Sequence, residues 1–314
     1  MIGAKGEVYS PAGTWLATVS YRNQHSDRRF VGTHEEPTPN VGINDINVFD
    51  LSIGYVLTSR YSLSAQVPIL NMDRSLAILD GRVVPRYATQ ASGIGDSSIM
   101  ARGWLLDPKN VRQNISLGLG TKIPTGQSDV TNTFPDSTVR TVDQSIQPGD
   151  GGWGIIFEAS AFKTFGDHFT LFTTIDYLSN PKGTNGVRTF RRRESEAIMS
   201  VADQYLARLG AAFPVWSKWN LSGTLAARIE GVPVHDLLGP SEGFRRPGYA
   251  LSIEPSLVFS LKHNTVSVSV PFAVRRNRKK SVPDEIDDPI VPGPGNGDAA
   301  FADYLVLVSY SLRF

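Results

Sequence analysis

The sequence contains no cysteine, and this absence excludes disulfide bonds, thiolate catalysis, c-type haem attachment and cysteine-ligated zinc. It is also compatible with a protein that crosses an oxidising compartment before it folds. The sequence also has no excess of positive or negative charge, because 31 Lys and Arg are balanced by 30 Asp and Glu. The chain therefore lacks the basic surplus that a nucleic-acid partner requires. We expect no nucleic-acid partner, no metal and no cofactor.

Long hydrophobic runs are absent too. A membrane helix needs about 18 consecutive apolar residues, whereas the longest uncharged runs, such as residues 209 to 216, are interrupted by Gly210 and Pro214. Helical membrane spans are therefore excluded. Residues 1 to 5 lack the apolar segment and cleavage site of a secretory signal, so we expect that a secreted form has already lost its signal peptide.

The dominant pattern that is present is alternation of apolar and polar residues with a period of two, which is typical of β-strands. In the segment from Thr14 to Arg22, for example, Trp15 and Val19 lie on one face while Thr18 and Ser20 lie on the other. The 29 Gly and 20 Pro are spread at intervals, as expected for many strands joined by turns. We predict twelve strands, at residues 14–22, 49–55, 62–69, 95–105, 115–122, 153–160, 169–177, 204–213, 219–229, 249–257, 265–272 and 304–314.

The connections between these strands alternate in length. Long loops are expected at 23–42, 71–93, 124–150, 179–199, 231–247 and 276–300, with short turns near 58–60, 106–111, 165–168, 214–218 and 261–264. Both termini then lie on the side of the short turns, which is typical of bacterial outer-membrane barrels. The fold class we predict is all-β, a transmembrane up-and-down antiparallel β-barrel of about 12 strands. Residues 13–314 form its single domain, and residues 1–12 form an N-terminal periplasmic segment.

A soluble β-sandwich or lipocalin-like barrel would also alternate, but two features favour the membrane barrel. The polar faces are rich in Ser, Thr, Gly, Asn and Gln with few charges, which suits a lumen better than a solvated outer surface. The apolar faces contain no charged residue and carry aromatic residues near the short turns, such as Tyr55, Phe165 and Trp216, as in an interfacial aromatic girdle. Pro255 interrupts one strand, and we expect a bulge or a local distortion there.

Several short motifs resemble those of the phenol meta-pathway degradation family of outer-membrane transporter-like β-barrels. They are Gly93-Ile94-Gly95-Asp96, the run from Gly118 to Gly126, Pro148-Gly149-Asp150-Gly151, the segments Arg245 to Tyr249 and Arg278 to Asp284, Glu254-Pro255, Val270-Pro271 and the final Phe314. The resemblance extends from about Thr14 to the end of the sequence. It implies a barrel in the outer membrane of a Gram-negative bacterium, associated with aromatic degradation, and it supplies no catalytic residues.

Charged residues on the polar faces are the candidates for lining the lumen. By parity they are Asp50, Asp96, Arg102, Lys122, Glu158, Asp176, Arg208, Arg228, Glu230, Glu254 and Arg275, with Arg22 beside them. They either pair across the interior and brace a narrow barrel, or form an array along a solute path. Twelve strands lie between the eight whose interior side chains fill and the sixteen that leave an aqueous channel, so we expect a narrow or partly plugged pore.

Two further sets of residues are candidates for contacts outside the lumen. Basic residues near the long-loop ends of strands, at the outer rim, could bind lipopolysaccharide phosphates through guanidinium and ammonium groups: Arg191, Arg192, Arg245, Arg246, Arg276, Arg278, Lys279 and Lys280. The C-terminal Phe314, with Leu312 and Tyr310 on its face, resembles the signal read by the barrel-assembly machinery. Alternatively, Phe314 is simply an aromatic girdle residue that faces the lipid.

These patterns predict a passive channel for small solutes, apolar or aromatic ones included, and not an enzyme. A scaffold barrel that contacts or encloses a protein partner is the alternative, and a homo-oligomer is compatible with either. An outer-membrane hydrolase is a third possibility, for which His235, Asp236 and Ser241 are the one local combination of suitable residues. The expected partners are outer-membrane lipid, lipopolysaccharide, the barrel-assembly machinery and a small solute.

Overall fold

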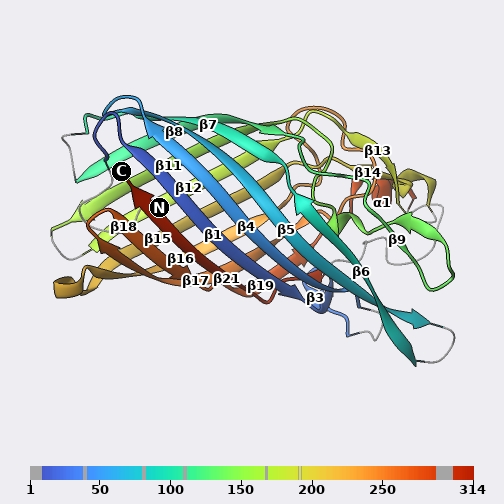
Figure 1. The fold of residues 1–314 in the computed structure, drawn as a ribbon. Helices are drawn as coiled ribbons and strands as arrows, with labels where there is room; N and C mark the ends of the chain where they lie inside the picture. Colours follow the sequence, from blue (N-terminus) through green and yellow to red (C-terminus); the bar gives the residue numbers. More distant parts are fainter. Residues whose placement is uncertain are drawn as a thin grey trace.

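The computed structural model describes residues 9–37, 41–79, 83–108, 112–166, 169–189, 191, 193–287 and 300–314. Twelve antiparallel strands form a closed barrel, in which the last strand pairs with the first, so the predicted strand number and fold class are confirmed (Figure 1). In order around the wall, the strands are β1 (Trp15–Ser26), β4 (Ile43–Val56), β5 (Tyr61–Leu79), β7 (Ser97–Trp104), β8 (Gln113–Ile123), β11 (Gly154–Phe165), β12 (Phe169–Ser179), β15 (Gln204–Trp216), β16 (Leu221–Val232), β17 (Gly248–Leu261), β18 (Asn264–Ser269) and β21 (Tyr304–Arg313).

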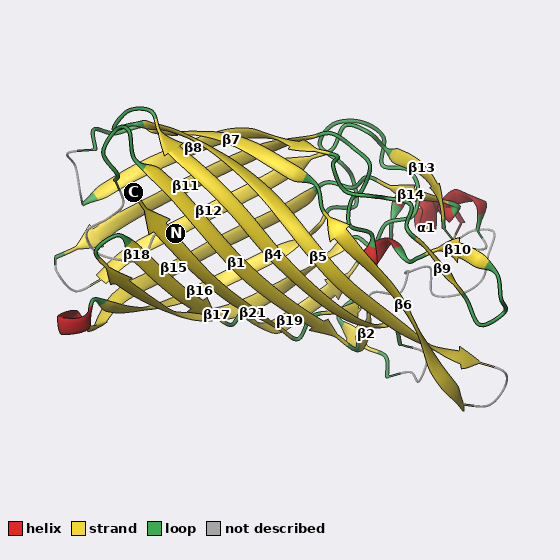
Figure 2. Ribbon diagram, in the orientation of Figure 1, coloured by secondary structure: helices red, strands yellow, loops and turns green. Residues whose placement is uncertain are grey.

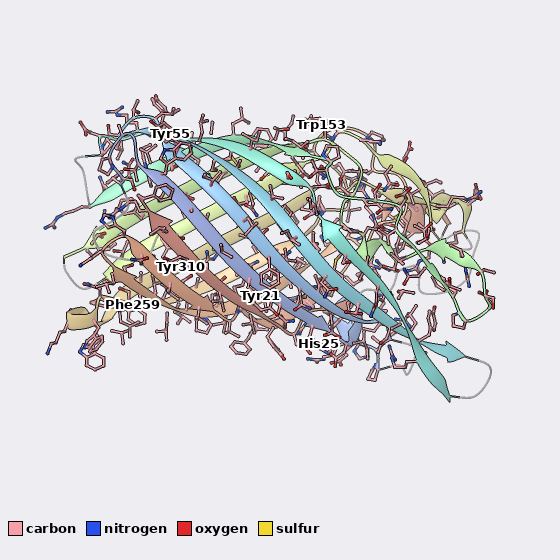
Figure 3. All side chains as sticks on the ribbon, viewed as in Figure 1. Tyr21, His25, Tyr55, Trp153, Phe259 and Tyr310 are labelled. Atoms are coloured by element: carbon pink, nitrogen blue, oxygen red, sulfur yellow. The ribbon has the colours of Figure 1, made fainter. Side chains whose placement is uncertain are left out.

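Alternation along each strand gives the barrel an apolar outer face and a more polar inner face. Val19, Leu51 and Leu225, on three different strands, are about half exposed on the outside, whereas the residues beside them face inward. Outward-facing aromatic residues gather at the short turns, where the rings of Trp15 and Tyr55 lie 4.7 Å apart. Figure 3 shows Tyr55, Phe259 and Tyr310 at this end of the barrel and Trp153 toward the other end. This arrangement is that of a barrel with two interfacial girdles.

The wall extends further at the long-loop end than the sequence pattern indicates. β6 (Val83–Ile94) continues the line of β7 and pairs with the far half of β5, so residues 71–93 form mostly a hairpin and not the predicted loop. This hairpin projects from the barrel in Figure 2. The prediction was wrong because Asn71 and Asp73 bring polar side chains to the outer face, which erases the alternation while the backbone pairing continues.

β19 (Phe272–Arg278) continues the line of β18 in the same way and pairs with β17. No bulge lies at Pro255 in the described ladder between β16 and β17, which stays in register; the local distortion is on the other side of β17. Instead, the register shift lies between Leu251 and Ser252, opposite the residues just before Arg275 on β19. Pro255 itself lies where β17 changes partner from β18 to β19, a position at which a missing N–H is tolerated.

The long connections carry small elements that fold over and into one end of the barrel (Figure 1). These elements are β2 (Arg28–Val31), β3 (His34–Glu35), β9 (Thr131–Thr133), β10 (Val139–Thr141), η1 (Gln144–Ile146), β13 (Thr184–Arg188), η2 (Glu194–Glu196), β14 (Ile198–Ser200), α1 (Val282–Asp287) and β20 (Ala300–Phe301), whereas η3 (Ser217–Trp219) lies at a short turn. None of the helices in the described ranges is both long enough and apolar enough to cross a membrane.

Candidate functional site

The glycine-rich motifs meet at one point of the wall, where β6 ends and β7 begins. The Asp96 carboxylate accepts hydrogen bonds from the backbone N–H groups of Gly126, at 3.0 Å, and Asp150, at 3.1 Å. Lys122 forms an ion pair with Asp150 and lies 3.8 Å from Asp96. We call this group the Asp96 junction. It ties the long loop between β8 and β11 to the break between β6 and β7.

Glycine is needed at this junction because the backbones approach too closely for a side chain. A Cβ on Gly126 would lie 2.8 Å from the Cα of Gly149, and one on Gly95 would lie 2.5 Å from a Leu70 methyl group. The motif residues therefore have a structural reason for their identity. Asp96 and Lys122, which we predicted to line the lumen, are part of this junction, and Lys122 is only 6% exposed.

A belt of charged side chains crosses the middle of the lumen. Arg102 and Glu158 form a bidentate pair, with both nitrogen to oxygen distances at 2.7 Å. Glu254 forms ion pairs with Arg208 and Arg228, and Arg228 forms a further ion pair with Glu230. Such pairing is expected of buried charges, because an unpaired buried charge is costly. We call the six residues Arg102, Glu158, Arg208, Arg228, Glu230 and Glu254 the charge belt. Its members pair with one another, which favours the bracing role.

Two inward charges stand apart from this pairing. Within the described residues, neither Arg22 on β1 nor Asp176 on β12 forms an ion pair or a hydrogen bond, and the Arg22 Nε is buried without an acceptor. Asp50, by contrast, accepts a hydrogen bond from Gln66 at 2.8 Å. Five strands lie between β1 and β12 in each direction around the wall, so the two strands are on opposite sides.

The strand register shows that Arg22 and Asp176 also lie near the same height. In one direction, the cross-strand pairs lead from Asp176 through β11, β8, β7 and β5 to Val56 on β4. The Val56 backbone N–H donates a hydrogen bond to the Thr14 carbonyl, just before β1. In the other direction, the cross-strand pairs lead through β15, β16 and β17 to Arg276 on β19. Arg276 forms an ion pair with Asp303, which lies just beyond the other end of β1. Arg22 lies between these two levels. The lumen therefore carries an unpaired cation on one wall and an unpaired anion on the other.

A cavity of about 180 Å³ lies beside Arg22 inside the barrel. Its wall comes from β1, β16, β17, β19 and β21, and the segment that follows β20 covers it. The polar lining includes Arg22, Gln24, Glu230, Ser252 and Asp303, and the apolar lining includes Ala250, Pro271, Ala273, Phe301 and Leu305.

An aromatic cluster narrows the barrel at the short-turn end. Trp104 faces inward, where its ring lies 6.0 Å from Phe162 and 5.1 Å from Tyr9. The Tyr9 hydroxyl also accepts a hydrogen bond from the side-chain amide of Asn114, and Phe172 completes the cluster. The periplasmic segment predicted at residues 1–12 stays a prediction, because residues 1–8 lie outside the described residues and Tyr9 packs against Trp104 at the short-turn end.

At the long-loop end, the segment that contains η1 folds into the mouth of the barrel. Val142 and Ile146 pack against Met72, which faces inward from β5. Asp143 forms a bidentate pair with Arg246, at 2.9 and 2.7 Å, and lies 3.7 Å from Arg74 of the wall. Burial alone would raise the pKa of Asp143, but the two guanidinium groups hold this pKa below its ordinary value. The Asp143 carboxylate therefore locks two loops to the wall.

Most of the predicted rim arginines lie inside the mouth and not on a hydrated rim. Arg245 is 2% exposed and pairs with Asp236, while Arg278 is 1% exposed and donates to the Pro247 carbonyl. Arg246 binds Asp143 and Arg276 binds Asp303. Each of these four side chains is engaged by a carboxylate or carbonyl within the folded loops. Arg191 stacks on Phe244, Lys279 and Lys280 are exposed, and Arg192 lies outside the described residues.

Arg275, predicted to line the lumen, points outward. The register shift before it puts Arg275 opposite Leu251, whose side chain faces away from the lumen, and brings Arg276 and Arg278 to the inside. One extra residue in a strand reverses the face of everything after it. The residues proposed for a hydrolase do not form a catalytic arrangement either. The Ser241 hydroxyl accepts a hydrogen bond from the Asp236 backbone N–H, and the Asp236 carboxylate binds Arg245.

No family model matches this chain, and no curated protein matches it. Among solved structures, it is similar to the COG4313 outer membrane channel from Pseudomonas putida F1, with 14% identity, 98% of each chain covered and a TM-score of 0.62. It is also similar to the translocator domain of autotransporter NalP from Neisseria meningitidis, with 10% identity, 97% of this chain and 90% of that chain covered, and a TM-score of 0.47. The likeness to the channel extends over nearly the whole chain and concerns the fold.

Proposed function

We propose that this protein is a passive channel for small solutes in the outer membrane of a Gram-negative bacterium. The observation that carries the proposal is the lumen itself, which holds a paired charge belt, two opposed unpaired charges and a cavity of about 180 Å³. A barrel that served only as a wall would need no unpaired charge inside, because each costs desolvation energy without a partner. The channel name of the structural neighbour from Pseudomonas putida supports the same function.

The two constrictions set the expected size of the solute. The aromatic cluster around Tyr9 and the loop lock at Asp143 narrow the two ends, so only small molecules would pass. An open aqueous pore of the kind found in barrels of sixteen strands is not expected. Passage would depend on small movements of side chains at both ends.

Single-channel recording in planar bilayers tests this proposal. We expect small discrete conductance steps from the purified protein and larger steps from Tyr9→Ala, because this substitution removes one ring from the aromatic cluster. Tyr61→Ala is the matched control, since Tyr61 is exposed on the outer face near a short turn. The absence of conductance steps with both the wild type and Tyr9→Ala would contradict the channel and favour the scaffold barrel. The packed side chains at both ends of the lumen support that alternative.

For the remaining contacts, we infer two sites. Lys279 and Lys280, exposed at the long-loop end, are candidates for lipopolysaccharide phosphates. Tyr310, Leu312 and Phe314 are candidates for recognition by the barrel-assembly machinery; Tyr310 pairs with the outward-facing Val19, and Phe314 is exposed.

A further inference from the structure

We propose that the cavity beside Arg22 binds a small monocarboxylate, whose carboxylate group pairs with the Arg22 guanidinium. This inference deepens the proposed function, because it names a class of solute for the lumen. It rests on the surroundings of Arg22, the charges along the cavity wall and the apolar part of the lining.

Arg22 forms no ion pair among the residues that the structure describes, and the inward-facing Asp50 on β4, opposite Ser20, accepts a hydrogen bond from Gln66. Its ladder neighbours are Val48 on β4 and Leu307 on β21, and neither carries a charge. The Nε atom is buried without an acceptor in the described part of the chain. A buried donor that lacks a partner loses its hydration without compensation, the more so when it is charged, so an anion that supplies acceptors would be stabilised here.

The carboxylates that line the same cavity already have cations of their own. Glu230 pairs with Arg228, which it shares with Glu254 of the charge belt. Asp303 pairs with Arg276 and, at 3.0 Å, with Arg28. The single positive charge of Arg22 is therefore left over in the cavity. Because two carboxylates also face this space, a monoanion fits it better than a dianion such as a phosphate monoester.

The remaining lining suits a compact apolar body. Pro271, Ala273 and Phe301 contribute hydrocarbon surface, while Gln24 and Ser252 offer neutral polar groups near the guanidinium. An apolar protein cavity of about 150 Å³ takes up benzene, so about 180 Å³ has room for one ring or a short branched chain with a carboxylate. The guanidinium fork matches a carboxylate in a bidentate geometry that an ammonium group cannot provide.

Isothermal titration calorimetry with benzoate and its neutral isostere benzamide tests the site on the intact protein in detergent. We expect the wild type to bind benzoate at least about tenfold more tightly than benzamide, which corresponds to about 1.4 kcal/mol. Arg22→Gln should abolish this preference, and Arg22→Lys should reduce it, because the charge remains while the fork is lost. Arg60→Gln, an exposed site at a short turn, should leave it unchanged.

The wild-type comparison needs no variant, so the proposal stays testable even if Arg22→Gln fails to fold. Equal affinity of the wild type for benzoate and benzamide, or a preference that survives in folded Arg22→Gln, would overturn the site. The result is also separate from the channel. A protein that binds benzoate in this way but never conducts would contradict the channel and leave the site intact, whereas one that conducts without the benzoate preference would do the reverse.

Discussion

Replacing Leu225 with arginine should strongly disfavour folding of the barrel into lipid. Leu225 is 52% exposed on the outer face of β16, and its ladder neighbours Ala211 and Pro255 face the same way, so no acidic side chain is beside it. An arginine near the bilayer midplane of a barrel costs about 2 to 4 kcal/mol. At 1.4 kcal/mol per tenfold change, the folding equilibrium should fall by about 30-fold to about 700-fold.

Gln66→Arg is the matched control for this substitution, because it puts the same side chain on the lumen side. Gln66 faces inward, is exposed to the lumen and donates a hydrogen bond to Asp50, so the new cation would have a carboxylate beside it. Urea titrations of both variants in lipid vesicles, followed by the heat-dependent shift of the folded barrel on gels, measure the difference. Equal unfolding midpoints for Leu225→Arg and Gln66→Arg would refute the assignment of the two faces.

Three further predictions concern the terminus, the lumen and the loop lock. Deleting Phe314 should lower the amount of barrel in the outer membrane of cells while leaving refolding into lipid in vitro nearly unchanged; normal levels in cells would remove the recognition role. Asp176→Asn should shift ion selectivity toward anions with little change in the unfolding midpoint, since Asp176 forms no ion pair or hydrogen bond within the described residues, and an unchanged reversal potential in a salt gradient would contradict this. Because the folded pKa of Asp143 is lowered, its stabilisation of the loop lock is present above the ordinary carboxyl pKa of about 3.9 and is lost as the pH falls from there toward the lowered folded value. The hydrogen-exchange protection factors of residues 139–147, which are corrected for the intrinsic pH dependence of exchange, should therefore fall on acidification in the wild type but not in Asp143→Asn, and equal pH dependence of the two would contradict the lock.

Much of the barrel could be predicted from the sequence because the membrane forces each spanning strand to show its two faces. Where both faces become polar, as at Asn71 and Asp73, the signal disappears although the strand continues. One inserted residue also reverses which residues of a strand face the lumen. The register shift before Arg275 reversed the faces of Arg275 and Arg276, and no local pattern in the sequence marks it.

The candidate site was only partly predictable, for a related reason. Alternation predicts that Arg102, Glu158 and Asp176 face inward, but which charges pair depends on contacts between strands far apart in the sequence. The Asp143 lock and the position of Tyr9 depend on loops and a terminal segment without periodicity. The runs of arginine looked like a hydrated rim, and only the inward folding of the loops makes them structural.

Efflux from proteoliposomes measures whether small solutes cross this barrel. Vesicles that contain the purified protein would be loaded with radiolabelled glycine and with a labelled dextran too large for a twelve-stranded barrel. We predict that glycine equilibrates across the membrane while the dextran stays inside, because the lumen passes small solutes through its two constrictions. Glycine release no faster than from protein-free vesicles would contradict the claim that this barrel is a channel.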